Sequence, residues 1–419
     1  MKDLRFICSQ PDDVYYTWQV HAWLESLKSI GHSDKAIVLV YTPSFREYNG
    51  KWEKIMELYP EAQFAFYKDE GDVSSQLGTY IPVLRPFSLM KYFQEHPEMM
   101  TKAVFYCDCD ILFTDKFNID DYINDEICYL SDTNSYINAS YFDSKDRDVL
   151  PDKLEEYRTR DILVELTSLI GITREIAEAN NDHSGGAQYF LKNIDSEFWK
   201  KVMNDCILIR VYLQNINKQF FKNENKGFQS WCADMWAVLW NVWLREKETK
   251  NIPELEFCWS SDPIEKLERT TLLHNAGITG QTSMGYPAFY KGAYHAGKDP
   301  FLDTHLDTVL NNETTKKKAN HYYLTQLIEI KTKYNITEIP EEVFYSFDPW
   351  VKFKMDQRCK FYYNSLIKNE INSTSESHLF FTLNWNTLFA NLISESNNIL
   401  FRFGMFDGIL FNINFVLKN

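Results

Sequence analysis

The stretch Val104–Phe113, VFYCDCDILF, places Asp108 and Asp110 inside an otherwise apolar run. Such a run predicts a buried strand, and two side chains one residue apart on a strand share a face. Two bare carboxylates that close repel each other and resist burial. A hard divalent cation relieves both problems, because carboxylate oxygens suit Mg²⁺ or Mn²⁺. We therefore expect a metal site here; the alternative is that the two aspartates only cap the following turn.

The composition limits the class of protein. The chain has 419 residues, 44% of them apolar and 16% aromatic, which is enough for a sizeable core. Its net charge of −15 disfavours a partner bound mainly through phosphates. The eight cysteines form no C-x-x-C pair, which predicts buried thiols in a reducing compartment. Because the sequence shows no apolar signal segment or membrane span, we expect a cytoplasmic protein of a bacterium or of a virus-infected host cell.

Strand and helix patterns alternate over the first 130 residues. Strands are predicted at 4–10, 35–42, 62–69, 104–113 and 126–132, and helices at 12–31, 50–58 and 85–96. This alternation is typical of a mostly parallel α/β sheet, in which ligands bind at the carboxyl ends of the strands. No G-x-G-x-x-G follows the first strand, so the dinucleotide-binding fingerprint is absent.

The remaining chain divides by composition. Residues 140–180 are charged and predict a partly helical surface excursion, and 183–205 predict a turn, a strand and a helix. A strong helix is predicted at 230–248, whose tryptophans are mostly core, although one exposed ring could stack on a sugar. We expect one large domain over 1–305, a helical linker over 306–337, and a small β-rich module of unknown function over 338–419.

Five segments stand in a characteristic order: TYIPVLRPFSLMKYF, VFYCDCDILF, SGGAQYFLKN, CADMWAVLWN and LLHNAGITG. Together they resemble the GT-A fold glycosyltransferases, an α/β (Rossmann-like) class whose D-x-D aspartates hold a divalent cation. The order looks closest to the hydroxyproline arabinosyltransferase and serine galactosyltransferase group and its viral relatives, with similarity to glycogenin-like retaining enzymes. The resemblance covers about residues 4–302.

The resemblance implies a set of site residues. The metal, Mn²⁺ or Mg²⁺, would be held by Asp108, Asp110 and His274, and the catalytic residues would be Asp234, Arg85 and Gln188. The nucleotide-sugar donor would contact Ser9, Gln10, Arg85, Asp108, Cys109, Gly185, Gly186, Gly277 and Lys291. One departure stands out, because Gly280 occupies the position of a diphosphate-binding lysine in the glycogenin-like enzymes. Lys291 is the nearest substitute.

The resemblance also implies a reaction. It is the metal-dependent transfer of a sugar, with retention, from a UDP-sugar to a hydroxyl of a glycan, a protein or a modified base of phage DNA. From the residues alone, His274 could be a structural histidine, and Asp234 could merely cap a helix. A nucleotidyl- or phosphotransferase would need a glycine-rich phosphate loop after the first strand, which is missing. A carbohydrate-binding protein with a degenerate transferase domain stays open as the non-enzymatic alternative.

Overall fold

The computed structural model describes residues 2–43, 47–69, 80–223, 226–295, 297–336, 377–383 and 388–394. The chain divides into two compact units, Met1–Thr337 and Glu338–Asn419. In the second unit β11 (Ser377–Leu383) and β12 (Leu388–Ser394) pair as antiparallel strands. The rest of the module that was predicted to be β-rich, over 338–419, lies outside the described residues.

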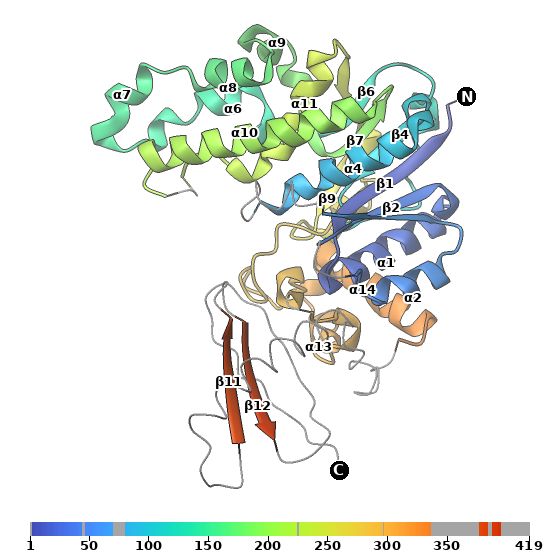
Figure 1. Cartoon of the computed structure of the whole chain (residues 1–419). Helices are drawn as coiled ribbons and strands as arrows, with labels where there is room; N and C mark the ends of the chain where they lie inside the picture. Colours follow the sequence, from blue (N-terminus) through green and yellow to red (C-terminus); the bar gives the residue numbers. More distant parts are fainter. Residues whose placement is uncertain are drawn as a thin grey trace. The chain divides into compact units, whose positions relative to one another are not determined.

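The first unit is a mixed α/β structure around a seven-stranded sheet of order β3-β2-β1-β4-β7-β6-β8 (Figure 1). Its strands are β1 (Leu4–Pro11), β2 (Ala36–Thr42), β3 (Gln63–Lys68), β4 (Ala103–Cys107), β6 (Cys128–Asp132), β7 (Gly185–Lys192) and β8 (Thr249–Asn251). The predicted parallel arrangement holds from β3 to β4. Strand β7 runs antiparallel to both of its neighbours, which places Gln188 opposite Cys107 at the carboxyl end of β4.

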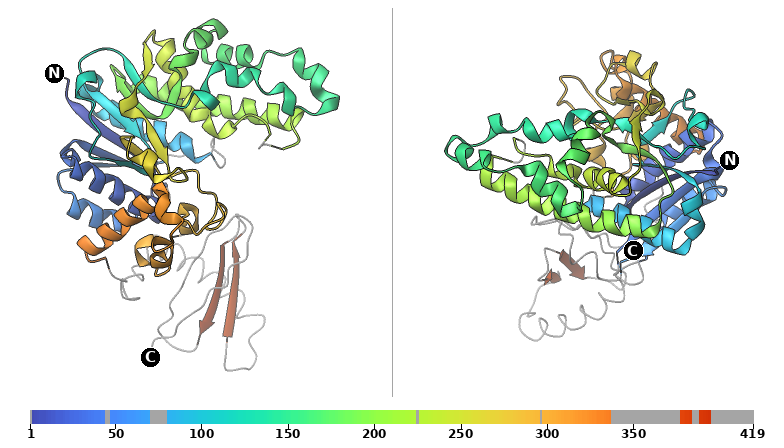
Figure 2. Two further views of the ribbon diagram at one scale, coloured as in Figure 1. Left: turned by 180° about the vertical axis from the view of Figure 1, so that it is seen from behind. Right: turned by 90° about the horizontal axis from the view of Figure 1, so that it is seen from above.

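Helices cover both faces of this sheet, as Figures 1 and 2 show. On one face lie α4 (Leu84–Glu95), α10 (Ser196–Phe220) and α11 (Ala233–Leu244), and on the other α1 (Val14–Ser29) and α2 (Lys51–Leu58). Strand β1 contributes side chains to both faces of the sheet: Ile7 packs toward α4, while Phe6 and Cys8 pack toward α1. Burial on both faces explains why these strands read as continuous apolar runs rather than alternating ones.

A second sheet, of order β5-β10-β9, adjoins the first through the chain that follows β4. Its strands are β5 (Ile111–Phe113), β9 (Phe257–Trp259) and β10 (Leu272–His274). Beside it lie α12 (Ile264–Leu267), α13 (Leu306–Leu310) and α14 (Ala319–Lys333). Tyr323 and Leu327 of α14 are buried in a cluster shared with Trp18 of α1, so the segment after residue 305 belongs to the first compact unit.

The predicted excursion between residues 140 and 180 is helical and is only partly on the surface. It contains α6 (Ala139–Asp143), α7 (Leu154–Arg158), α8 (Ile162–Ile170) and α9 (Arg174–Ala179), after a first short helix α5 (Asn134–Ile137). Leu163 and Leu166 of α8 are buried in the same cluster as α10 and α11. Within the described residues, no helix has the length and apolar character needed to cross a membrane.

The prediction of buried thiols is confirmed for the cysteines in the described residues. All seven that lie in the described residues are buried and have free thiols. Cys359 lies outside those residues. Burial raises the pKa of Cys8, Cys107 and Cys109, so these thiols stay protonated and pack as small apolar side chains.

The buried His21 of α1 predicts a loss of stability in acid. Its ring is 4% exposed, and burial lowers its pKa to about 4 against the opposing charge of Glu25. Asp299 also opposes the shift, and Lys333 reinforces it. Because the unfolded chain takes up a proton on His21 near pH 6.5 and the folded chain does not, stability falls as the pH drops through this window. We expect His21 to contribute about 2 kcal/mol to the loss between pH 7 and pH 5.

Urea unfolding at pH 7 and pH 5 measures this contribution. His21→Gln removes the titrating group, so its unfolding free energy should change less between the two pH values than that of the unmodified protein. Equal changes in both proteins would show that His21 does not titrate differently on folding.

Candidate active site

The two aspartates lie in a turn rather than on a strand. Strand β4 ends at Cys107 and β5 begins at Ile111, so the prediction of one continuous strand over 104–113 is wrong. Cys109 is buried among apolar side chains between them, whereas Asp108 stays partly exposed and Asp110 is buried. The turn brings both carboxylates to the same edge because Cys109 is anchored in the core on the other side.

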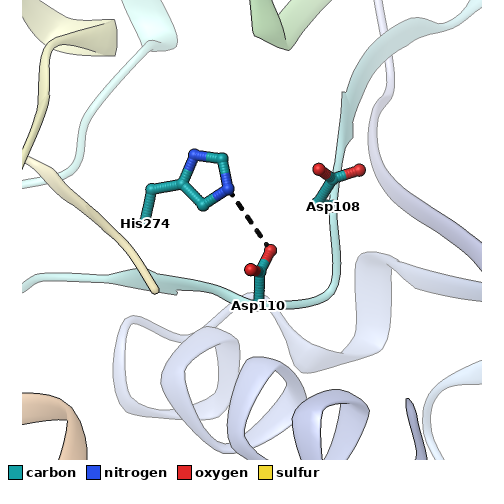
Figure 3. A group of neighbouring side chains, drawn as sticks. All are labelled: Asp108, Asp110 and His274. Atoms are coloured by element: carbon teal, nitrogen blue, oxygen red, sulfur yellow. Dashed lines mark ion pairs between the residues drawn. The ribbon is translucent and has the colours of Figure 1, made fainter. Parts of the chain in front are cut away.

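His274 reaches the aspartates through strand pairing. Strand β10 runs antiparallel to β5 with His274 opposite Ile111, and the Asn275 N–H donates to the Asp110 carbonyl at 3.0 Å. This register puts His274 Nε2 3.5 Å from Asp110 Oδ1, as the dashed line in Figure 3 marks. One ligand atom from each of Asp108, Asp110 and His274 lies within 4.8 Å of the others. A single cation between them could contact all three.

The charges around the aspartates are balanced by two basic side chains. Lys291 pairs with Asp110, and Arg85 pairs with Asp108. Burial by itself would raise the pKa of Asp110, but the charge and hydrogen bond of Lys291, together with the other polar groups around the carboxylate, outweigh it and hold the pKa below its usual value. The Asp110 carboxylate is therefore charged at neutral pH, and the Asp108 carboxylate has the Arg85 guanidinium as its partner. Two such oxygens and an imidazole form a donor set that fits Mn²⁺ or Mg²⁺.

Gln188 supports His274 from the neighbouring strand. Its Nε2 lies 3.4 Å from His274 Nδ1, and its Oε1 is buried with no hydrogen-bond partner among the described residues. Burial lowers the pKa of His274 to about 4, although Asp110 opposes the shift, so the imidazole is neutral at pH 7. With the amide turned over, Oε1 would accept a hydrogen bond from Nδ1–H and leave the Nε2 lone pair facing the aspartates. The orphaned amide oxygen thus fits a histidine that serves as a metal ligand.

The backbone before Gln188 is strained. Ala187 has φ +68°, a left-handed conformation that few residues other than glycine adopt. Gly186 precedes it, and a Cβ atom there would lie only 2.7 Å from Met235 Cε. Gly185 is equally confined, because a Cβ atom would meet the Ser131 carbonyl oxygen. These two glycines therefore let β7 approach α11 and β6 closely.

Arg85 connects the aspartate turn to a third carboxylate. It lies at the start of α4 and donates from Nη2 to Asp234 Oδ2 at 2.7 Å, while its Nη1 contacts Asp108. Asp234 belongs to the first turn of α11. Burial opposes the charge on Arg85, but Asp234 raises the pKa of the guanidinium, so the cation is stable. Ser9 Oγ donates to the Arg85 carbonyl at 3.3 Å and so fixes the start of α4.

Two predicted donor contacts have their side chains inside the fold, and a third, Gly277, has a special backbone conformation. Gln10 donates from Nε2 to the Leu39 carbonyl at 2.8 Å, inside the main sheet. The Cys109 thiol faces the core. Gly277 has φ +87° and follows β10 by three residues; a Cβ atom there would lie 2.9 Å from Ser261 Oγ. The left-handed conformation of Gly277 turns the chain after His274.

Tyr80 is a site residue that the sequence did not predict. Its hydroxyl lies 3.2 Å from Asp234 Oδ1, accepts the Asp234 N–H at 3.0 Å and donates to the Trp231 carbonyl at 2.8 Å. Tyr80 stands in the first of the five quoted segments, but nothing in that segment marks its hydroxyl as a partner of Asp234, so only the three-dimensional fold could reveal the contact.

No protein-family model matches the sequence, and no curated protein matches it either. The solved structures found by comparison of folds include the bifunctional glycosyltransferase WbbM in its apo form, with 12% identity and a TM-score of 0.37. That match covers 66% of this chain and 46% of WbbM, so the chain spans less than half the length of that protein.

Two further structures are matched over almost their whole length. The galactosyltransferase LgtC, in complex with donor and acceptor sugar analogs, has 11% identity and a TM-score of 0.36, over 81% of this chain and 98% of LgtC. Apo mouse xyloside xylosyltransferase 1 has 9% identity and a TM-score of 0.30, over 66% of this chain and 99% of the other. All three are glycosyltransferases, but at these identities and TM-scores the likeness does not identify the family of this chain.

Proposed function

We propose that this protein is a metal-dependent glycosyltransferase of the GT-A type, which moves a sugar from a nucleoside-diphosphate donor, a UDP-sugar, to a hydroxyl acceptor. The observation that carries the proposal is the grouping of Asp108, Asp110 and His274 beside Arg85, Lys291 and Asp234. Three ligand atoms, the two basic side chains Arg85 and Lys291 and a further carboxylate meet the needs of a diphosphate leaving group and of the sugar attached to it.

The metal ligands would hold Mn²⁺ or Mg²⁺, which when bound neutralises charge on the diphosphate. Arg85 and Lys291 are the protein's own cations at the same place. In the structure each pairs with an aspartate of the turn, so each is available to exchange that partner for a phosphate oxygen. Positive charge aimed at the leaving group lowers the barrier because the negative charge there grows in the transition state.

Asp234 is proposed to act on the sugar. Its carboxylate is paired with the Arg85 guanidinium and lies against the Tyr80 hydroxyl, so two contacts fix its position. Facing the sugar ring, such a charge would stabilise the positively charged transition state. For a retaining reaction, the acceptor hydroxyl attacks on the leaving-group side, and the departing phosphate oxygen takes its proton. Gln188, which is fully buried beside the imidazole, is proposed to hold the His274 ring in position for the metal.

A donor screen tests this proposal. The full chain is incubated with Mn²⁺ and, one at a time, UDP-, GDP- and CMP-linked sugars, and free nucleotide is measured. We expect nucleotide release from at least one UDP-sugar and loss of that release when EDTA is added. Release that is unchanged in EDTA would contradict metal dependence, and no release from any donor would leave the non-catalytic carbohydrate-binding function as the better description.

A further inference from the structure

Trp231 is a large aromatic side chain left in solvent beside the candidate active site. Its exposed fraction is 58%, whereas the other tryptophans of the same helical segment, Trp236, Trp240 and Trp243, are buried. Ile81, which follows Tyr80, is 46% exposed. An indole exposed beside a candidate active site offers a broad apolar face with a polar edge, the kind of surface that a ligand can pack against.

The exposed ring is held by a rigid support. The carbonyl of Trp231 accepts the Tyr80 hydroxyl at 2.8 Å, and the two rings meet edge to face with centroids 6.0 Å apart. The Arg210 guanidinium lies 4.3 Å from the centre of the Tyr80 ring and donates to Ser230 Oγ at 3.4 Å. The indole is therefore positioned before any ligand arrives, which lowers the entropy cost of binding.

A continuous line of contacts joins this ring to the aspartate turn. From Asp108 the line passes to Arg85, from Arg85 to Asp234, and from Asp234 to the Tyr80 hydroxyl, which also holds the Trp231 carbonyl. His274 and Lys291 lie at the other end, on Asp110. The proposed function places the diphosphate near Asp110 and the transferred sugar near Asp234. An acceptor bound next to that sugar would then lie near Tyr80 and Trp231.

We infer that Trp231 is a binding platform for the acceptor substrate and that this substrate presents a sugar ring to it. The inference rests on the proposed glycosyltransferase function. The C–H face of a pyranose is apolar and packs on an indole face, while its hydroxyls stay in water. A nucleic acid could also stack on the ring, but the net charge of −15 on the chain disfavours a partner that is bound mainly through phosphates. The acceptor class is thus a glycan or glycoside rather than a DNA base.

Two variants of Trp231 distinguish loss of ring stacking from loss of the folded structure. Trp231→Ala removes the ring, and Trp231→Phe keeps an aromatic face; because the side chain is exposed, both should fold. Leu169→Ala is the matched control, since Leu169 is 46% exposed on α8. The probes are methyl glycosides of glucose, galactose and xylose, and a single-stranded DNA oligonucleotide as the competing class. Binding is measured by saturation-transfer NMR, and transfer is measured with the donor found in the screen.

For Trp231→Ala we expect the acceptor KM to rise roughly fivefold to tenfold, with weaker NMR binding of the glycoside. Trp231→Phe and Leu169→Ala should stay within about twofold of the unmodified protein. Hydrolysis of the donor by water should be unchanged in all three, because the proposal places Trp231 against the acceptor and not against the donor. An unchanged acceptor KM in Trp231→Ala, or transfer to the oligonucleotide alone, would overturn the platform. If the unmodified protein hydrolyses no donor, the proposed function itself fails.

Discussion

Asp110→Asn is expected to reduce metal-dependent nucleotide release by at least about 100-fold, because the buried Asp110 carboxylate is the one ligand close to both His274 and Lys291. The amide keeps the size of the side chain but removes its charge, so the cation loses a ligand and Lys291 loses its partner. Release of nucleotide with a saturating donor and a series of Mn²⁺ concentrations measures the effect. Higher Mn²⁺ should restore part of the activity if the loss lies in metal binding.

Asp121→Asn provides the matched control for this experiment. Asp121 is an exposed aspartate in the same connection after β5, and it takes no part in the group of three ligands. It should keep full activity and the same response to Mn²⁺. If Asp110→Asn retains more than about a tenth of the activity, the aspartate turn is not a metal site.

Arg85→Met is expected to have the second large effect. Removing the guanidinium leaves Asp108 and Asp234 without their shared cation and takes one positive charge from the proposed diphosphate position. We expect activity to fall by about 100- to 1000-fold, the usual cost of losing one charged group that stabilises a transition state. Stability should fall by about 2–4 kcal/mol, because two partly buried carboxylates lose their partner. Nucleotide release and urea unfolding measure the two effects separately.

The double variant Arg85→Met with Asp234→Leu distinguishes the two roles of Arg85. It removes the unpaired carboxylate as well, so stability should recover in part while activity stays lost. Arg85→Lys should lie between, since one ammonium cannot reach both carboxylates as the planar guanidinium does. Activity within about twofold of normal in Arg85→Met would exclude Arg85 from the reaction, whatever the stability shows.

The main sheet was predictable from the sequence because each strand and helix carries a local signal. The helix over 12–31 has a capping aspartate, Asp13, and ends before Gly31, and the structure places α1 within those limits. Strand β7 was predicted, but its direction was not, since a short apolar run is the same for both directions. The length of α10 was also missed: it continues to Phe220, well past the predicted end at 205, and its apolar face is interrupted by charged residues.

At the site, the order of the motifs predicted the grouping of Asp108, Asp110 and His274. It did not predict the ion pairs that these residues form with other side chains. Arg85 was expected to reach a donor, yet it also joins Asp108 to Asp234, a pairing between distant segments that no spacing rule contains. Lys291 was only a substitute for a missing lysine, and the structure puts it on Asp110. Gln10 looked available at the end of β1, but its amide is used within the sheet. Side-chain partners between elements depend on packing, which a single sequence does not encode locally.

The pairing of β5 with β10 limits where insertions and deletions can occur as the sequence evolves. His274 meets Asp110 only because it stands opposite Ile111, and β5 and β10 are each three residues long. Side chains alternate between the two faces of a strand, so a slip of one position would replace the imidazole with Leu273 or Asn275. Insertions and deletions should therefore be tolerated in the surrounding loops but not between Asp108 and Phe113 or within β10. The position of His274 among the ligands is set by the register of the short β5–β10 ladder rather than by a bond to the imidazole itself.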